Sequence, residues 1–232
     1  MATRAEPGRS SARRTRKGEI LKTFTEMVAD RGYDQVSLRD IAEALGISKG
    51  TILHHYGSKD RLLEQLHAEY MRRRLDEAHR ILEQLHAPTE RLAALIYQNL
   101  LLVQREDRAG TVAFAREIVR FQSDSLMTEV REMRHAYFQL VCDVVRSGIE
   151  EGVFRPTGEP ALITYQVFGM LNWMWTWLRP EGRWGIDEIA RTYLGTFLGG
   201  LAADMKDAAV LEHSDVAATV EKIMVDVGGQ AD

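Results

Sequence analysis

Cysteine and proline are scarce in this chain of 232 residues, which has one cysteine and five prolines. A single cysteine, Cys142, excludes an intrachain disulfide and fits a reducing cytoplasm. No cationic side chain neighbours Cys142 in the sequence, so a small buried residue is favoured over a reactive thiol.

Long hydrophobic segments are lacking as well. The basic N-terminus contains no apolar stretch of the kind found in signal peptides. The longest uncharged run, Ala161 to Leu178, reaches only the lower limit for spanning a bilayer and is interrupted by polar residues such as Thr164 and Gln166. We therefore interpret this run as a buried helix and expect no membrane partner.

The sequence has no nucleophile elbow, no P-loop and no glycine-rich dinucleotide motif, so we expect no catalytic residues. A helical di-iron enzyme stays as a remote alternative because of three Glu-x-x-His pairs, Glu64-His67, Glu83-His86 and Glu132-His135. The first two pairs lie on one predicted helix, roughly 28 Å apart, and cannot share a metal pair. We expect no metal and no cofactor.

Charge is distributed unevenly along the chain. Residues 1–60 carry 11 basic and 8 acidic side chains, whereas the remaining residues carry 19 basic and 26 acidic ones. A basic end on an acidic protein indicates a polyanionic partner for the first 60 residues.

Apolar residues recur at helical spacing along most of the chain, and no credible run of alternating strands is found. The sequence therefore predicts an all-α protein of about nine or ten helices. We expect a disordered basic arm over 1–16, a three-helix unit over 17–60, a larger helical domain over 61–206, and a C-terminal helix or tail over 207–232.

Two short helices are predicted close together within 37–56. Ser37 begins a Ser-x-x-Asp capping signal, and Gly46 ends the helix after about two turns. Ser48 caps the next helix, which extends from Lys49 to Tyr56. Helices joined by so few residues cross at a steep angle, which is typical of the helix-turn-helix.

The second helix of such a pair lies in the major groove, and its first residues reach the bases. We therefore assign base contacts to Lys49, Gly50 and Thr51, and place Ile52 in the core. Residues at the helix ends contact phosphate instead, and here we name Ser37, Arg39, Tyr56 and Lys59, with Ser48 as the cap. For the adjacent histidines, we favour a DNA contact for His54 and a half-buried packing role for His55.

The run "VSLRDIAEALGISKGTILHHYGSKDRLLEQL" closely resembles the DNA-binding domain of the TetR family of transcriptional regulators. The resemblance covers roughly residues 17–66. It implies that 17–60 is the DNA-binding domain and that 61–206 is the effector-binding and dimerisation domain. The basic arm is then either a solvated tail or a segment that contacts the minor groove. The resemblance also implies a symmetric homodimer on a palindromic operator of double-stranded DNA, a larger helical domain that binds a small effector, and a cytoplasmic, nucleoid-associated repressor. The chain departs from the family at Leu53, where an aromatic residue is usual, so a phenolic phosphate contact is absent there.

Four tryptophans stand between 173 and 184. The segment resembles the Asn-Trp-x-x-x-Trp-x-x-Pro-x-Gly signature of TetR-type repressors of fatty-acid and steroid degradation, which implies an acyl-CoA thioester as the apolar effector. A drug-like or aromatic effector is the alternative, and core or interface packing would explain part of the tryptophans. The candidate effector residues are Tyr97, Leu101, Phe114, Arg116, Ile118, Arg120, Phe121, Tyr137, Val141, Phe168, Trp173 and Trp177.

Small residues mark the predicted helix 187–201, which carries Gly195, Gly199 and Gly200. Such residues allow helices to approach closely, so we expect this helix and the tryptophan-bearing one to form the dimer interface. A buried role inside one chain is the competing interpretation.

Overall fold

The computed structural model describes residues 7–102, 108–117, 125–179, 181–204 and 215–228, with side chains from Arg16 onward. Every named element in these ranges is helical, and one isolated bridge joins Phe154 to Ala202. The all-α prediction is confirmed. None of the described helices is both long enough and apolar enough to cross a membrane.

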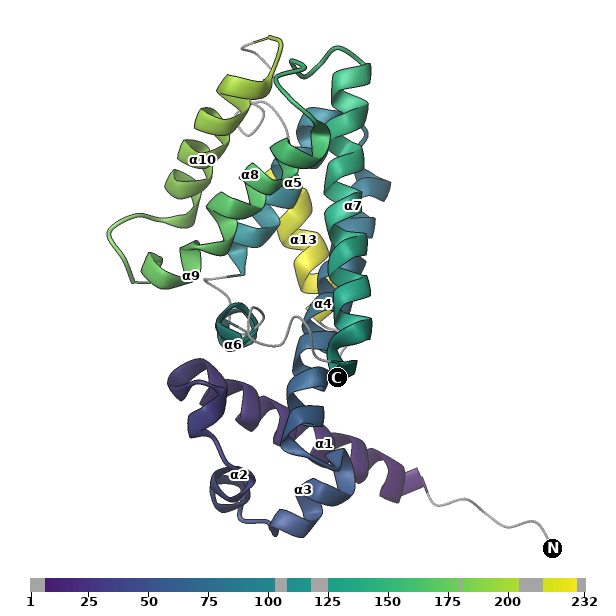
Figure 1. Ribbon diagram of the computed structural model, residues 1–232, viewed down its shortest axis with the longest axis vertical. Helices are drawn as coiled ribbons and strands as arrows, with labels where there is room; N and C mark the ends of the chain where they lie inside the picture. The colour runs from purple at the N-terminus through teal and green to yellow at the C-terminus, as the bar shows by residue number, and fades with distance from the viewer. Residues whose placement is uncertain (1–6, 103–107, 118–124, 180, 205–214, 229–232) are drawn as a thin grey trace, which may run out of the picture.

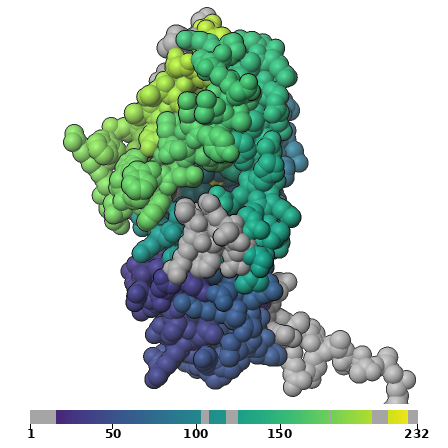
Figure 2. All heavy atoms as spheres, in the orientation of Figure 1, coloured from purple at the N-terminus to yellow at the C-terminus, as the bar shows by residue number. Residues whose placement is uncertain are grey.

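The N-terminal unit lies at the lower end of the molecule in Figure 1 and Figure 2. It consists of α1, η1, α2 and α3, which span Pro7–Arg31, Tyr33–Gln35, Leu38–Leu45 and Lys49–Tyr56. Its core contains Ile20, Phe24, Ile41 and Ile52, all 0% exposed. The apolar face predicted for the first helix is therefore buried against the helix-turn-helix.

Helix α1 begins at Pro7, so the backbone is helical over most of the segment expected to be a disordered arm. Residues 1–6 lie outside the described part of the chain. Helix propensity explains why α1 begins so early. The arm is rich in arginine and alanine, which favour helices, and proline is tolerated in a first turn.

Helix α4, Lys59–Gln84, continues from the N-terminal unit into the larger part of the molecule (Figure 1). The other elements of that part are α5 Pro88–Leu101, α6 Arg108–Glu117, η2 Ser125–Met127, α7 Thr128–Glu150, α8 Pro160–Asn172, α9 Met174–Trp177, α10 Ile186–Leu201 and α13 Val216–Gly228. In Figure 1, α6 is seen end-on between the two parts. Helix α6 packs against both α1 and α4, so it bridges them.

The C-terminal segment forms a helix rather than a tail over 216–228. Helix α13 packs against α4 and α5 and buries Val216, Val220, Ile223 and Met224. It therefore completes the core of the larger part and is not a separate unit.

The predicted helix over 161–178 is interrupted. Trp173 ends α8 and precedes the short α9, and its side chain is 67% exposed. Leu162 and Tyr165, on the same helix, are 58% and 63% exposed. Within one chain, this segment is therefore buried on one face only, because α8 packs on α7 and α5 and leaves its other face open.

Candidate nucleic-acid interface

Local capping fixes both short helices of the N-terminal unit. The Ser37 hydroxyl accepts a hydrogen bond from Asp40 N at 3.2 Å, and the Asp40 carboxylate accepts one from Ser37 N at 2.7 Å. Gly46 adopts φ 62°, which glycine reaches without a Cβ penalty, and closes α2. The Ser48 hydroxyl accepts from Thr51 N at 3.0 Å and starts α3. The predicted caps are confirmed.

Helix α3 presents its first turn to solvent. Lys49, Gly50 and His54 are exposed, and Leu53 is 39% exposed, whereas Ile52 is completely buried. The prediction that Ile52 points into the core is confirmed. The opposite face is therefore an exposed surface of one cation, one glycine, one aliphatic side chain and one imidazole.

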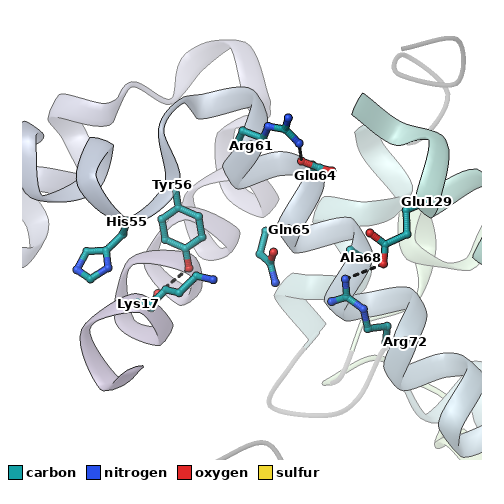
Figure 3. A pocket seen from close by; sticks show the side chains of 9 residues that line it. All are labelled: Lys17, His55, Tyr56, Arg61, Glu64, Gln65, Ala68, Arg72 and Glu129. Atoms are coloured by element: carbon teal, nitrogen blue, oxygen red, sulfur yellow. Dashed lines mark hydrogen bonds and ion pairs between the residues drawn. The ribbon is translucent and has the colours of Figure 1, made fainter. Parts of the chain in front are cut away.

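Two of the predicted DNA-contact residues use their hydroxyl groups in hydrogen bonds within the chain. The Thr51 hydroxyl lies 3.0 Å from the Ser48 hydroxyl. The Tyr56 hydroxyl donates to the Lys17 carbonyl at 2.8 Å, and burial raises the pKa of Tyr56. Figure 3 shows Tyr56 pointing at Lys17. Tyr56 therefore ties the end of α3 to α1, and its proton is not directed at a phosphate.

The remaining predicted phosphate contacts lie at helix starts. The Arg39 guanidinium pairs with the Glu43 carboxylate at 2.7 Å, and both side chains are exposed, so the pair is weak and can be exchanged for a phosphate. The Lys59 ammonium lies 3.9 Å from the centre of the Tyr33 ring. The Tyr33 hydroxyl in turn donates to the Asp60 carboxylate. These contacts hold the start of α4 against η1.

Helix α6 is attached to the N-terminal unit by two neighbouring side chains. The Glu117 carboxylate accepts a buried hydrogen bond from Tyr33 N at 2.9 Å. Arg116 donates to the carbonyls of Ala29 and Asp30, at 2.9 and 3.2 Å, and so satisfies the C-terminus of α1. The structure thus places Arg116, a candidate effector residue from the sequence, at this junction.

Sequence reasoning missed Glu117 and Tyr33 altogether. The two residues are 84 positions apart, and neither belongs to a recognisable motif. The one local signal is Gly32, whose φ of 84° and ψ of 157° bring the chain back beneath α6.

The predicted effector residues fall into separate groups. Tyr97 is 1% exposed, and its hydroxyl is committed to Asp187 and Glu221 at 2.9 and 3.2 Å, so its polar end faces the surface between α10 and α13. Leu101 is half-buried against the core, and Val141 is buried. Trp177 is 39% exposed, so like Trp173 it lies at the surface of the single chain. Three of the predicted residues lie outside the described residues, namely Ile118, Arg120 and Phe121.

Three aromatic residues of the predicted effector site are buried or half-buried against the core. Tyr137 is 6% exposed, and its ring centre lies 5.9 Å from that of Phe168. Phe114 stacks on Tyr70 of α4 at 4.3 Å. The structure thus brings Tyr137 and Phe168 together, and it places Phe114 at the crossing of α4 and α6.

A surface hollow of about 280 Å³ opens beside the N-terminal unit (Figure 3). Four of its charged side chains are already paired, Arg61 with Glu64 at 2.7 Å and Arg72 with Glu129 at 2.9 Å. An apolar effector has no match in such a polar lining. Among the described residues, no group of three or more His, Cys, Asp or Glu side chains could hold a metal ion.

Comparison with known proteins agrees with this architecture. Residues 20–66 match the family model described as bacterial regulatory proteins, tetR family, and residues 85–201 match that of the tetracyclin repressor-like C-terminal domain. The chain is 28% identical over 191 residues to the HTH-type transcriptional repressor KstR2 of Mycobacterium tuberculosis, covering 82% of this chain and 94% of that protein. It is 27% identical over 206 residues to KstR2 of Mycolicibacterium smegmatis, covering 87% and 98%.

Two solved structures are similar as well. The ketosteroid transcriptional regulator KstR2 of Mycobacterium tuberculosis superposes with a TM-score of 0.75 at 27% identity, covering 82% of this chain and 96% of that one. AibR in complex with isovaleryl coenzyme A and operator DNA gives a TM-score of 0.72 at 25% identity, covering 78% and 97%. Members of this group are DNA-binding transcriptional regulators and not enzymes. The two matched domains and the exposed first turn of α3 together show that the chain belongs to the TetR family of bacterial regulatory proteins.

Proposed function

We propose that the protein is a homodimeric repressor that binds a palindromic operator and is released by an apolar effector. The observation that carries this proposal is the exposed first turn of α3, held in place by the Ser48 cap and the buried Ile52. The leading residues of a recognition helix are the ones that reach base edges.

The individual roles follow from the chemistry of each side chain. Lys49 donates to a guanine edge, Gly50 allows close backbone approach, and Leu53 meets a thymine methyl group. Arg39 and Lys59 lie at helix starts and contact phosphate, which positions the protein without reading sequence.

Dimerisation is supported by the open faces of α8 and α10. Leu162, Tyr165 and Trp173 form a large exposed apolar surface, which in a soluble protein marks an interaction site. A Cβ added at Gly195 or Gly199 would meet nothing within 4 Å in this chain, so these glycines leave room for a second copy. In the dimer, the two α3 helices must be about 34–36 Å apart to enter successive major grooves.

The effector in this proposal is an acyl-CoA thioester. The structure of AibR with isovaleryl coenzyme A supports this class. The similarity to KstR2, a ketosteroid transcriptional regulator, supports an apolar body for the ligand. An aromatic effector is a second candidate, because Phe138 contacts both Tyr165 and Phe168, at ring distances of 4.6 and 6.0 Å, and such rings would suit a planar ligand.

Fluorescence anisotropy on DNA from the promoter of its own gene tests the proposal. We expect sequence-selective binding that weakens steeply with salt, and a loss of about 1–3 kcal/mol in Lys49→Ala. Lys222→Ala, an exposed lysine on α13, is the matched control and should bind as the wild type does. Equal affinity for promoter and random DNA would refute the proposal. Mass spectrometry of compounds that co-purify with the protein separates a thioester from an aromatic effector.

A further inference from the structure

Three ionisable side chains on one face of α4 are buried in the larger part of the molecule. His67 and Glu77 are 0% exposed, and Arg74 is 3% exposed. Charged residues are almost never buried this completely unless they are paired, so each needs a partner that explains its position.

The burial of the Glu77 carboxylate is explained by its hydrogen-bond partners. The carboxylate accepts from Arg74 at 2.6 Å, from Gln98 at 2.8 Å and from Arg73 at 3.3 Å. The network continues, since the Tyr137 hydroxyl donates to the Gln98 side chain at 3.1 Å. This side of the cluster is a satisfied structural network.

The burial of Arg74 and His67 is not explained by partners in the same way. Arg74 uses one nitrogen on Glu77, but its Nε and Nη1 are buried and have no hydrogen-bond partner among the described residues. Within the same part of the chain, both ring nitrogens of His67 are buried without a partner as well. Unsatisfied buried donors are rare and costly, and a guanidinium has no way to avoid the cost by losing its proton.

The two side chains border the same pair of aromatic rings. His67 lies 5.0 Å from the Phe114 ring, Phe114 stacks on Tyr70, and the Arg74 guanidinium lies 5.4 Å from the Tyr70 ring. Unused polar groups therefore lie beside an apolar wall. That combination suits a ligand with an apolar body and one polar group.

The local charge favours an anion for that polar group. Glu77 is the one carboxylate in the network described, and it is shared by two arginines. Burial, together with the positive charge of Arg134 on α7, lowers the pKa of His67 to about 4, so this imidazole is neutral at physiological pH and can donate one hydrogen bond. A carboxylate is the group that matches an arginine fork best.

We propose that Arg74, with His67 beside it, binds a carboxylate at the buried end of an otherwise apolar effector. The proposal rests on the proposed function and names the chemistry of its effector site. Because a thioester carbonyl is uncharged, the carboxylate in an acyl-CoA effector would be a second group at the far end of the acyl chain. Contact with the ligand would also displace Phe114, which lies one helical turn before Glu117 on α6. Effector binding between α4 and α6 would in this way reach the junction that holds α1.

The binding experiment compares octanoate with octanol, which has no carboxylate, by calorimetry on the full chain. We expect octanoate to bind, octanol to bind at least about tenfold more weakly, and Arg74→Met to weaken octanoate binding by about ten- to hundredfold, as expected for loss of a charged hydrogen bond. Arg72→Met is the matched control, because Arg72 lies on the same helix but pairs with Glu129 at the surface. Its octanoate affinity should stay within about threefold of the wild type.

A second measurement observes the proposed contact directly. The ¹⁵N–¹H resonance of Arg74 Nε, assigned by its absence in Arg74→Met, should shift on addition of octanoate and not of octanol. Because Arg74→Met leaves Glu77 with fewer partners, the double variant Arg74→Met/Glu77→Gln keeps the charge balanced and should show the same loss of affinity.

The outcomes separate this inference from the proposed function. If octanoate fails to shift the Arg74 Nε resonance, or if octanoate and octanol bind equally well to the wild type and to Arg74→Met, the carboxylate site is overturned and buried water satisfies these atoms instead. Release of promoter DNA by octanoate that is unchanged in Arg74→Met would overturn the site and leave the repressor proposal intact. Absence of selective DNA binding, with octanoate still bound at Arg74, would overturn the repressor proposal and leave the carboxylate site intact.

Discussion

Glu117→Ala removes the acceptor that joins α6 to the N-terminal unit, and its effect can be worked out from the geometry. The Glu117 carboxylate is 7% exposed and accepts from the Tyr33 N–H at 2.9 Å; Tyr33 itself is 8% exposed. A hydrogen bond with one charged partner contributes about 1.5–3 kcal/mol, and its loss leaves a buried N–H without a partner. We therefore expect Glu117→Ala to lower the free energy of unfolding by about 2 kcal/mol.

Thermal unfolding followed by circular dichroism measures this loss. For a chain of this size, about 2 kcal/mol corresponds to a fall in Tm of about 4–8 °C. Glu117→Gln keeps an oxygen acceptor, so its Tm should fall by less than half as much. Glu129→Ala is the matched surface control, because Glu129 pairs with the exposed Arg72 and such pairs contribute little.

The same variant has a functional readout. Because Glu117 links α6 to η1 next to the helix-turn-helix, Glu117→Ala should need more effector to release promoter DNA, measured by anisotropy with an acyl-CoA titration. A Tm within about 1 °C of the wild type would refute the energetic reasoning. A lowered Tm with an unchanged effector titration would show that the contact stabilises the fold without transmitting the signal.

Three further perturbations have defined outcomes. Leu53→Tyr adds a phenolic hydroxyl to the exposed face of α3 and should strengthen DNA binding or alter its selectivity in anisotropy; unchanged binding would contradict the role given to Leu53. Gly32→Ala places a Cβ at φ 84°, a conformation almost restricted to glycine, and should cost about 1–3 kcal/mol in urea unfolding; a wild-type midpoint would contradict this. The pKa of His67 in the folded protein is about 4, below its ordinary value of 6.5. The contribution of the neutral His67 to the free energy of unfolding is therefore fully present above pH 6.5, and it should fall by about 3 kcal/mol as the pH drops to 4. His67→Leu should remove that part of the pH dependence, and identical pH profiles would refute the assignment.

Features governed by neighbouring residues were predicted well from the sequence. The Ser37 and Ser48 caps act over three residues, Gly46 ends its helix through its own φ, and Ile52 is buried because its place in a short helix faces the core. The all-α class follows in the same way, from apolar spacing repeated along the chain. Such signals lie within one or two turns, so the sequence displays them directly.

The polar contacts of the interior were not predicted, because they depend on which helices meet. Arg116 was assigned to an effector, yet it caps α1 from 86 and 87 residues away. Tyr97 was assigned to an effector wall, yet its hydroxyl belongs to Asp187 and Glu221. The periodicity of an amphipathic helix predicts which face a side chain lies on, but the packing of the whole chain determines which residue that side chain contacts.

The sequence by itself determined the helix-turn-helix, the capping of its two short helices and the family, because these rest on residue types at fixed short spacing. Only the tertiary structure decided that α6 is attached to the N-terminal unit through Glu117 and Tyr33, that Trp173 lies at the surface, and that Arg74 is buried with two nitrogens unpartnered. The physical reason is that hydrogen bonds and burial at these positions join segments distant in the chain, and no local pattern encodes such a meeting.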